Sequence, residues 1–171
     1  MQDQIKVPKD RLAVIIGEKG KIKRSIESAT DTTISINSKD AEVTIDSNDG
    51  LQLLVAKNII QAIARGFNPS IANRLLKDDQ FCAFIDMTDF CRNKQDLKRV
   101  KARAIGTDGK ARKMLERLTN THIVVYGKTV GIIGAVQNTD LARRAMTQLL
   151  QGAKHGNVYA LIEREKRRSK E

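Results

Sequence analysis

The 171 residues are enough for one large domain or two small ones, so length alone does not decide the domain organisation. Hydrophobic residues make up 40% and charged residues 30%, as in ordinary globular proteins, but aromatic residues make up only 4% and Trp is absent. The core must therefore be built from Ile, Leu, Val and Ala. The formal net charge of +11 predicts a positive surface that attracts phosphate, which favours nucleic acid as the partner.

Membrane, secretory and metal-binding classes are disfavoured. Residues 1–5 are polar without an apolar core of signal-peptide length, and no apolar run approaches the roughly 18–20 residues of a membrane span. We therefore expect a cytoplasmic protein without membrane contact. Cys82, Cys91, His122 and His155 lack the ligand spacing of a zinc site, so we expect no metal and no cofactor.

The first part of the chain predicts the order strand, helix, helix, strand, strand, helix. Residues 33–37 and 42–46 alternate between polar and apolar side chains, which is typical of half-buried strands, whereas the helical segments repeat apolar residues three or four positions apart. The expected elements are a strand at 5–7 that stops at Pro8, a helix at 11–16 that ends at Gly17, a helix with Ile22, Ile26 and Ala29 on one face, strands at 33–37 and 42–46, and a helix over 51–63 that closes at Gly66.

The second part repeats this order. The expected elements are a strand at 81–87, a basic helix at 97–105 that ends at Gly106, a helix with Ala111, Met114, Leu115 and Leu118 on one face, a hairpin of strands 122–126 and 129–133, and a helix over 141–150 that Thr139 or Asp140 caps and Gly152 closes. Each part therefore reads βααββα, which predicts an α+β fold with a three-stranded antiparallel sheet and helices on one face.

We predict domain boundaries from these patterns. Residues 1–67 form the first domain, residues 68–80 a structured linker with a short helix, and residues 81–153 the second domain. Residues 154–171 form a basic C-terminal helix and tail, with the helix over 158–167. This basic tail is either a solvated surface or an additional RNA contact, and the sequence leaves both readings open.

An internal repeat carries the functional prediction. Residues 17–36 align without gaps with residues 106–125, which lie 89 positions later. Both glycines, the Lys after them, a Glu, two threonines and an Ile coincide. A shared helical pattern does not readily place both glycines and their basic neighbours.

The first Gly-x-x-Gly loop resembles the signature of the type I KH domain, in which such a loop joins two helices and clamps about four unstacked nucleotides. Glycines let the backbone approach the sugar-phosphate closely, and the amides at the start of the next helix favour an anion. The aliphatic side chains of Ile16, Ile22 and Ile36 are expected to line an adjacent groove for the bases. The predicted RNA-binding residues of this unit are Ile16, Gly17, Glu18, Lys19, Gly20, Lys21, Ile22, Arg24 and Ile36.

The second loop keeps both glycines and Lys110 but has Asp108 in place of a basic residue, which weakens its attraction for phosphate. We expect neighbouring cations to compensate. The predicted RNA-binding residues of this unit are Arg99, Arg103, Ile105, Gly106, Thr107, Asp108, Gly109, Lys110, Arg112 and Lys113.

Other motifs are weaker. Residues 127–129 read Gly-Lys-Thr, but the Gly that a phosphate-binding P-loop needs five positions earlier is replaced by His122. Residues 131–134 form a third Gly-x-x-Gly with an apolar middle, which predicts a bulge or a packing site in a strand. A nuclease is the rival class, yet Asp86, Asp89 and Asp96 match no metal motif and read as strand-end and helix-cap carboxylates. The chain reads as a binding protein without catalytic residues.

Across nearly its whole length the chain resembles the archaeal members of the Partner-of-Nob family, also called Dim-two. Residues 15–20, 64–69, 99–106 and 127–130 carry the match, and the linker segment 64–69 is the distinctive one. The resemblance implies a small-ribosomal-subunit assembly factor that binds single-stranded RNA near the 3′ end of the small-subunit rRNA. It also implies partnership with the endonuclease that matures that end and with the α subunit of translation initiation factor two. Eukaryotic relatives tend to lose the first Gly-x-x-Gly, which this chain keeps.

Two alternatives retain the fold. In one, a KH unit docks a protein while the other contacts RNA. In the other, the chain is a KH subunit of an RNA-degrading complex, although it shows no accompanying S1-like barrel.

Overall fold

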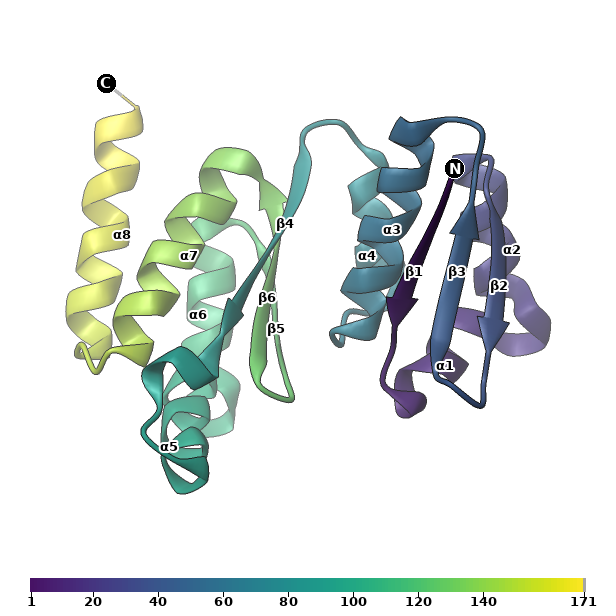
Figure 1. Ribbon diagram of the computed structural model, residues 1–171. Coiled ribbons are helices and arrows are strands. Elements are labelled where there is room, and N and C mark those ends of the chain that lie inside the picture. The colour runs from purple at the N-terminus through teal and green to yellow at the C-terminus, as the bar shows by residue number, and fades with distance from the viewer. Residues whose placement is uncertain (171) are drawn as a thin grey trace. The chain divides into compact units, whose positions relative to one another are not determined.

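The computed structural model describes residues 1–170 and divides the chain into two compact units, the first over Met1–Asp78 and the second from Asp79 onward (Figure 1). In the first unit the elements are β1 (Gln2–Lys6), α1 (Lys9–Ile16), the 3₁₀ turn η1 (Glu18–Gly20), α2 (Lys21–Thr30), β2 (Thr33–Asn37), β3 (Glu42–Asp46), α3 (Gly50–Ala64), α4 (Pro69–Ala72) and η2 (Asn73–Leu76). The sheet order is β1-β3-β2, with both pairs antiparallel.

The second unit repeats the arrangement. Its elements are β4 (Gln80–Asp86), η3 (Met87–Phe90), α5 (Lys94–Ile105), η4 (Thr107–Gly109), α6 (Lys110–Thr119), β5 (His122–Tyr126), β6 (Thr129–Ala135), α7 (Val136–Leu150) and α8 (His155–Ser169). The sheet order β4-β6-β5 is again fully antiparallel. The predicted fold class, two βααββα units and a C-terminal helix, is confirmed.

Aliphatic side chains fill both units, as the low aromatic content requires. In the first unit Ile15, Ile26 and Ile45 are fully buried. In the second, Leu115, Ile132 and Met146 belong to one buried cluster. On the first sheet this burial follows the two-residue alternation of the strands, whereas in the second unit residues 130–134 of β6 are all buried.

The threonines that coincide in the repeat have a structural role. Thr30 Oγ1 donates to the carbonyl of Ile26 (2.7 Å) and lies 2.9 Å from the hydroxyl of Thr32. Thr119 makes the equivalent bond to Leu115 (2.6 Å) and lies 2.8 Å from the hydroxyl of Thr121. All four threonines are buried, so each pair satisfies its own hydroxyls at the turn from helix to strand.

One detail differs from the sequence prediction. Helix α7 begins directly after β6 without a connecting loop, so Thr139 lies inside the helix and the predicted cap at Thr139 or Asp140 is wrong. For residues 131–134 the prediction left a bulge or a packing site open. They pair regularly within β6 and form a packing site, because a Cβ on Gly134 would lie 2.9 Å from Cγ2 of Thr121.

The C-terminal helix is an integral part of the second unit. Val158 and Ile162 of α8 are fully buried in the same cluster as the strands and α7, and Figure 1 shows α8 running beside α7. Helix α8 starts three residues earlier than predicted. As a result, His155 at its first turn comes close to α5, where its Nε2 lies 3.3 Å from the carbonyl of Arg103.

Candidate nucleic-acid interface

The two Gly-x-x-Gly loops have nearly the same backbone. Gly17 and Gly106 have φ/ψ of 73°/179° and 76°/174°, and Gly20 and Gly109 have 76°/14° and 74°/14°. The residue between them, Lys19 in one loop and Asp108 in the other, has φ of 55° in both. Two segments with different middle residues therefore adopt one conformation, as expected if the glycines and the flanking helices set it.

The first glycine of each loop is required by packing as well as by its backbone angles. A Cβ on Gly17 would lie 2.3 Å from Cγ1 of Ile22, and a Cβ on Gly106 would lie 2.7 Å from Cβ of Ala111. Ile22 was predicted to line the base groove. The structure places it directly against Gly17, where it supports the loop.

The loops present backbone amides and cations to solvent. Neither α2 nor α6 has a side chain that caps its first amides. The amides of Lys21 and Lys110 donate to the carbonyls of Glu18 and Thr107, and the positive end of each helix dipole favours an anion there. Lys19 and Lys21 are exposed beside the first loop, and Lys110 beside the second. Arg24 and Lys113, each four residues after the second glycine of their loop, extend back over that glycine. A Cβ on Gly20 would lie 3.2 Å from Nη1 of Arg24, and a Cβ on Gly109 would lie 3.7 Å from Cε of Lys113.

Three of the predicted RNA-binding arginines are bound within the protein. Arg112 donates to the carboxylate of Glu116 and to the carbonyl of Ile123 (3.1 Å). Arg103 donates from Nε to the carbonyl of Leu149 (2.9 Å) and from Nη2 to that of Ala153 (2.6 Å). Arg99 pairs with Asp96 at 2.8 Å, but its side chain remains 62% exposed. Of the three, Arg99 is therefore the one most accessible to a ligand.

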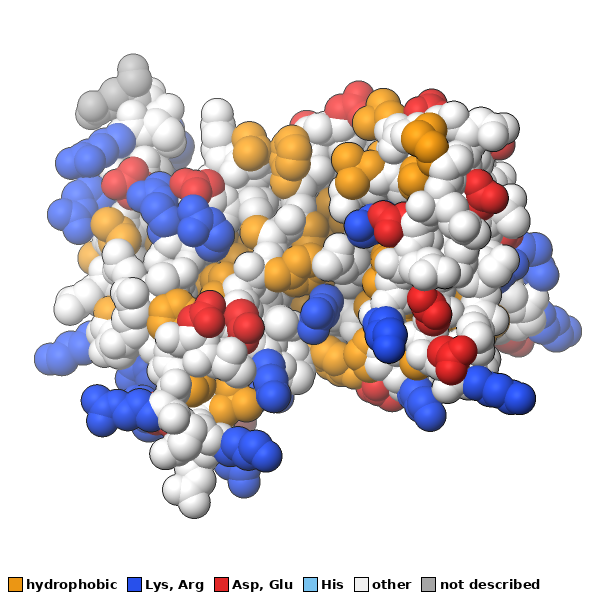
Figure 2. All heavy atoms as spheres, in the orientation of Figure 1, with side chains coloured by type: hydrophobic (Ala, Val, Ile, Leu, Met, Phe, Trp, Pro, Cys, Tyr) orange, Lys and Arg blue, Asp and Glu red, His pale blue; other side chains and the backbone are white. Residues whose placement is uncertain are grey.

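The aliphatic groove residues remain a prediction. Ile16, Ile36 and Ile105 are half-buried, which leaves part of each side chain at the surface near the loops. Figure 2 shows Lys and Arg side chains gathered around α5 and along α8 of the second unit, whereas the first unit carries them more sparsely on this face.

Among residues 1–170, no three His, Cys, Asp or Glu side chains lie together as possible metal ligands. Asp86 accepts from the amide of Thr88 (2.9 Å) and Asp96 from that of Arg92 (3.0 Å), so both act at helix starts, as predicted for strand-end and cap carboxylates. Burial raises the pKa of the Cys82 thiol to about 12, which makes it a poor nucleophile at neutral pH. None of the helices described is long and apolar enough to cross a membrane.

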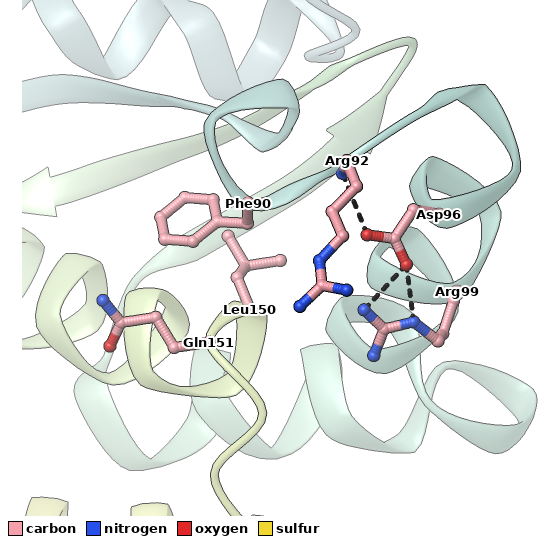
Figure 3. A pocket seen from close by; sticks show the side chains of 6 residues that line it. All are labelled: Phe90, Arg92, Asp96, Arg99, Leu150 and Gln151. Carbon is pink, nitrogen blue, oxygen red and sulfur yellow. Dashed lines mark hydrogen bonds and ion pairs between the residues drawn. The ribbon is translucent and has the colours of Figure 1, made fainter.

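Sequence reasoning missed two adjoining recesses on the second unit. One lies between α5, the second loop and α8, and includes His155 and Tyr159. The other is lined by Phe90, Arg92, Asp96, Arg99, Leu150 and Gln151 (Figure 3). The first forms because α8 packs against α6 and α7, which brings His155 at its start close to α5. No periodicity in the sequence predicts that contact, although an aromatic pair four residues apart on a basic helix was a usable signal.

Comparisons with known proteins agree with this architecture. Residues 81–167 match the family model of the second KH domain of PNO1 proteins, described as a eukaryotic-type KH domain (type I), and residues 2–62 match the KH domain. A KH domain-containing protein of Methanocaldococcus jannaschii is 39% identical over 97% of this chain and 74% of its own length. The RNA-binding protein pno1 of Dictyostelium discoideum is 28% identical over 93% of this chain and 69% of its own length.

Solved structures extend the match to the whole chain. Dim2p of Pyrococcus horikoshii OT3, crystallised in a complex with eIF2alpha and rRNA, is 40% identical with a TM-score of 0.90, covering 98% of this chain and 94% of that one. A protein of unknown function from Aeropyrum pernix is 32% identical with a TM-score of 0.93, covering 99% of this chain and 95% of that one. The chain therefore belongs to the Partner-of-Nob (PNO1, Dim2p) family of proteins with two KH domains.

Proposed function

We propose that the chain binds single-stranded RNA through both Gly-x-x-Gly loops and acts as an assembly factor at the 3′ end of the small-subunit rRNA. The observation that carries the proposal is the shared loop geometry, with three positive-φ residues in each loop followed by a helix whose first amides have no side-chain cap. Such a backbone admits a sugar-phosphate chain closely and offers it N–H donors.

The relatives support the choice of RNA. The homologue from Chaetomium thermophilum is named a pre-rRNA-processing protein, although this chain spans only 44% of its length. The Pyrococcus Dim2p complex contains rRNA and eIF2alpha. By this likeness we propose the α subunit of initiation factor two as a protein partner, with the rRNA 3′-end endonuclease as a second. The proposed role is RNA binding without catalysis, and the proposed compartment is the cytoplasm. Its reducing conditions keep cysteines such as the two free ones of this chain as thiols.

A second candidate function is protein docking by one unit. Asp108 favours it for the second unit, because a carboxylate at the tip of the loop repels phosphate, whereas the first loop has Lys19 there. In that case the first unit alone binds the RNA.

Fluorescence anisotropy with a short RNA copy of the small-subunit rRNA 3′ end and a scrambled RNA, over a salt series, tests the proposal. Lys19→Asp places in the first loop the residue that the second loop already carries in the same conformation, so the fold is retained. Thr107→Asp alters an exposed residue of the second loop.

We expect each variant to weaken sequence-dependent binding. Loss in Lys19→Asp alone would favour the docking function for the second unit. The proposal would be overturned if both RNAs bound with equal affinity, if that affinity fell steeply with salt, and if neither variant changed it. The net charge of +11 alone would then account for the binding.

A further inference from the structure

A pocket of about 510 Å³ lies behind the second loop. It is an open recess bordered by α5, the start of α6 and α8. Its lining combines cations with an aromatic pair: Arg99, Arg103, Lys110, His155 and Tyr159, together with Gly106 and Thr107 of the loop itself. All of these residues belong to the second unit.

This pocket lies on a different flank of α5 from the predicted base groove. Arg99 and Arg103 are four residues apart and share one side of the helix, whereas Ile105, which occupies the position of the predicted groove residue Ile16 in the repeat, follows Arg103 by two positions. Two positions rotate a helix by about 200°, so Ile105 points away from the side that Arg103 occupies. A ligand in the pocket would therefore leave the groove unoccupied.

The aromatic pair is held in place. Tyr159 is half-buried and packs against the hydrophobic cluster of the unit. His155 meets it edge-on, with ring centroids 6.3 Å apart and planes inclined by 65°. The carbonyl of Arg103 can only accept a hydrogen bond, so His155 carries a proton on the Nε2 that lies 3.3 Å from it. Both rings are thus positioned before any ligand arrives, which lowers the entropic cost of stacking.

Arg99 connects this pocket to the neighbouring recess. It lines both, and its guanidinium is oriented by Asp96, which accepts from Nε and Nη2 at 2.8 Å (Figure 3). In the same view Arg92 extends between Leu150 and Arg99, and the ring of Phe90 lies at the far side of the recess. Cations and aromatic rings therefore line both recesses, the combination that single-stranded nucleic acids require.

We propose that an RNA strand held by the second loop continues into this pocket, so that the second unit binds more nucleotides than the loop and its groove alone. Tyr159 stacks on one base, and Arg99 and Lys110 contact the phosphates on either side of it. The inference rests on the proposed RNA-binding function and adds a subsite to it. RNA is favoured over an acidic peptide because the loop that clamps the backbone forms one wall of the pocket.

The test uses RNAs of increasing length, starting at about four nucleotides, the number one KH unit holds. The full chain carries Lys19→Asp so that the first loop contributes less. Tyr159→Leu keeps the packing and removes the stacking ring, and Arg99→Gln removes an exposed cation. Arg143→Gln is the matched control, because Arg143 forms the same i,i+3 pair with Asp140 at 2.8 Å but lines neither recess.

We expect Tyr159→Leu and Arg99→Gln to lower the affinity for the longer RNAs by about five- to tenfold, as the loss of one stacked base implies. The affinity for the shortest RNA should not change. Arg143→Gln should leave both unchanged. An RNA with 5-iodouridine at successive positions should crosslink to Tyr159 on irradiation. Unchanged affinity at every length, without a crosslink on α8, would overturn the subsite. The RNA subsite would also be overturned if Tyr159→Leu abolished the binding of a polyglutamate peptide but left RNA binding intact. If Thr107→Asp also has no effect on RNA binding, the proposed function itself fails, which is a separate result.

Discussion

Gly17 and Ile22 lie so close that a Cβ on the glycine would be 2.3 Å from Cγ1 of the isoleucine. The backbone of Gly17, at φ 73° and ψ 179°, also lies in a region open almost only to glycine. Ile22 is the second residue of α2, so the loop cannot move away from the clash without shifting that helix. The first glycine of the motif is therefore a structural requirement before it is a functional one.

Gly17→Ala should destabilise the protein by about 1–3 kcal/mol, the cost of holding a non-glycine residue in this conformation, with the overlap adding to it. Urea denaturation followed by circular dichroism measures the change. Gly156→Ala is the matched control, because Gly156 has an open environment within α8 and Ala favours a helix. If Gly17→Ala and the parent chain are equally stable, the loop relaxes around the new side chain. A substitution of Gly17 would then probe RNA binding without disturbing the fold, as Lys19→Asp does.

Cys82 provides a prediction for alkaline pH. Burial raises the pKa of its thiol from 9.0 to about 12. In the unfolded chain the thiol ionises from about pH 9, whereas in the folded chain it keeps its proton. The stabilisation that Cys82 contributes is therefore complete below pH 9 and is lost as the pH rises from 9 towards 12.

The difference in stability between the parent chain and Cys82→Ala, measured from pH 7 to 11, isolates this effect from the Lys and Tyr residues that titrate in the same range. We expect the advantage of the parent chain to shrink above pH 9. The native thiol should also react slowly with a thiol reagent at pH 8. A difference that stays constant with pH, or rapid labelling of Cys82, would contradict a buried neutral thiol.

Much of the fold could be predicted from sequence because local patterns determine it. Strict alternation identified β2 and β3, and the gap-free repeat fixed the equivalence of the two loops. The start of α7 was missed for a physical reason. Thr139 is a good capping residue, but the chain passes from β6 into the helix without a loop, and no local preference for a cap operates there.

The candidate site was predicted in part. The loop residues and their flanking lysines lie at the surface as expected, because a Gly-x-x-Gly between two helices is a local motif. The roles of Arg103 and Arg112 were not foreseeable, since their carbonyl acceptors at Leu149 and Ile123 depend on tertiary packing. The same holds for His155 and Tyr159, which reach the second loop only because α8 docks on α6 and α7.

Each unit uses one arginine to join its first helix to the C-terminal end of its third, α3 or α7. Arg103 donates to the carbonyls of Leu149 and Ala153, and Arg11 donates to those of Ile63 and Phe67, at 2.8 and 2.9 Å. Arg103→Ala should destabilise the protein by about 1.5–3 kcal/mol for each charged hydrogen bond lost. The loss is smaller where water can hydrogen-bond to the vacated carbonyls. Arg143→Ala, which removes only an exposed ion pair, should cost under about 1 kcal/mol. Thermal unfolding of both variants checks this, and similar melting temperatures would show that the buried bonds contribute no more than the exposed pair.

Exchanging the middle residues of the two loops should shift their affinities in opposite directions. Lys19 and Asp108 have the same φ of 55° at equivalent positions, so each backbone already accepts the other's residue. Asp108→Lys replaces a charge that repels phosphate with one that attracts it, and we expect RNA to bind about three- to tenfold more tightly at low salt. The slope of log K against log salt should steepen by roughly 0.7 for each additional phosphate contacted.

Asp78→Lys, the same change of charge at an exposed position outside both loops, serves as the control for net charge. The double exchange Lys19→Asp with Asp108→Lys leaves the net charge unchanged. If the loops are the binding sites, the exchange should move photocrosslinks from the first loop to the second while the overall salt slope stays nearly constant. If Asp108→Lys tightens binding no more than an added lysine elsewhere, the second loop does not touch RNA, and protein docking becomes the better account of the second unit.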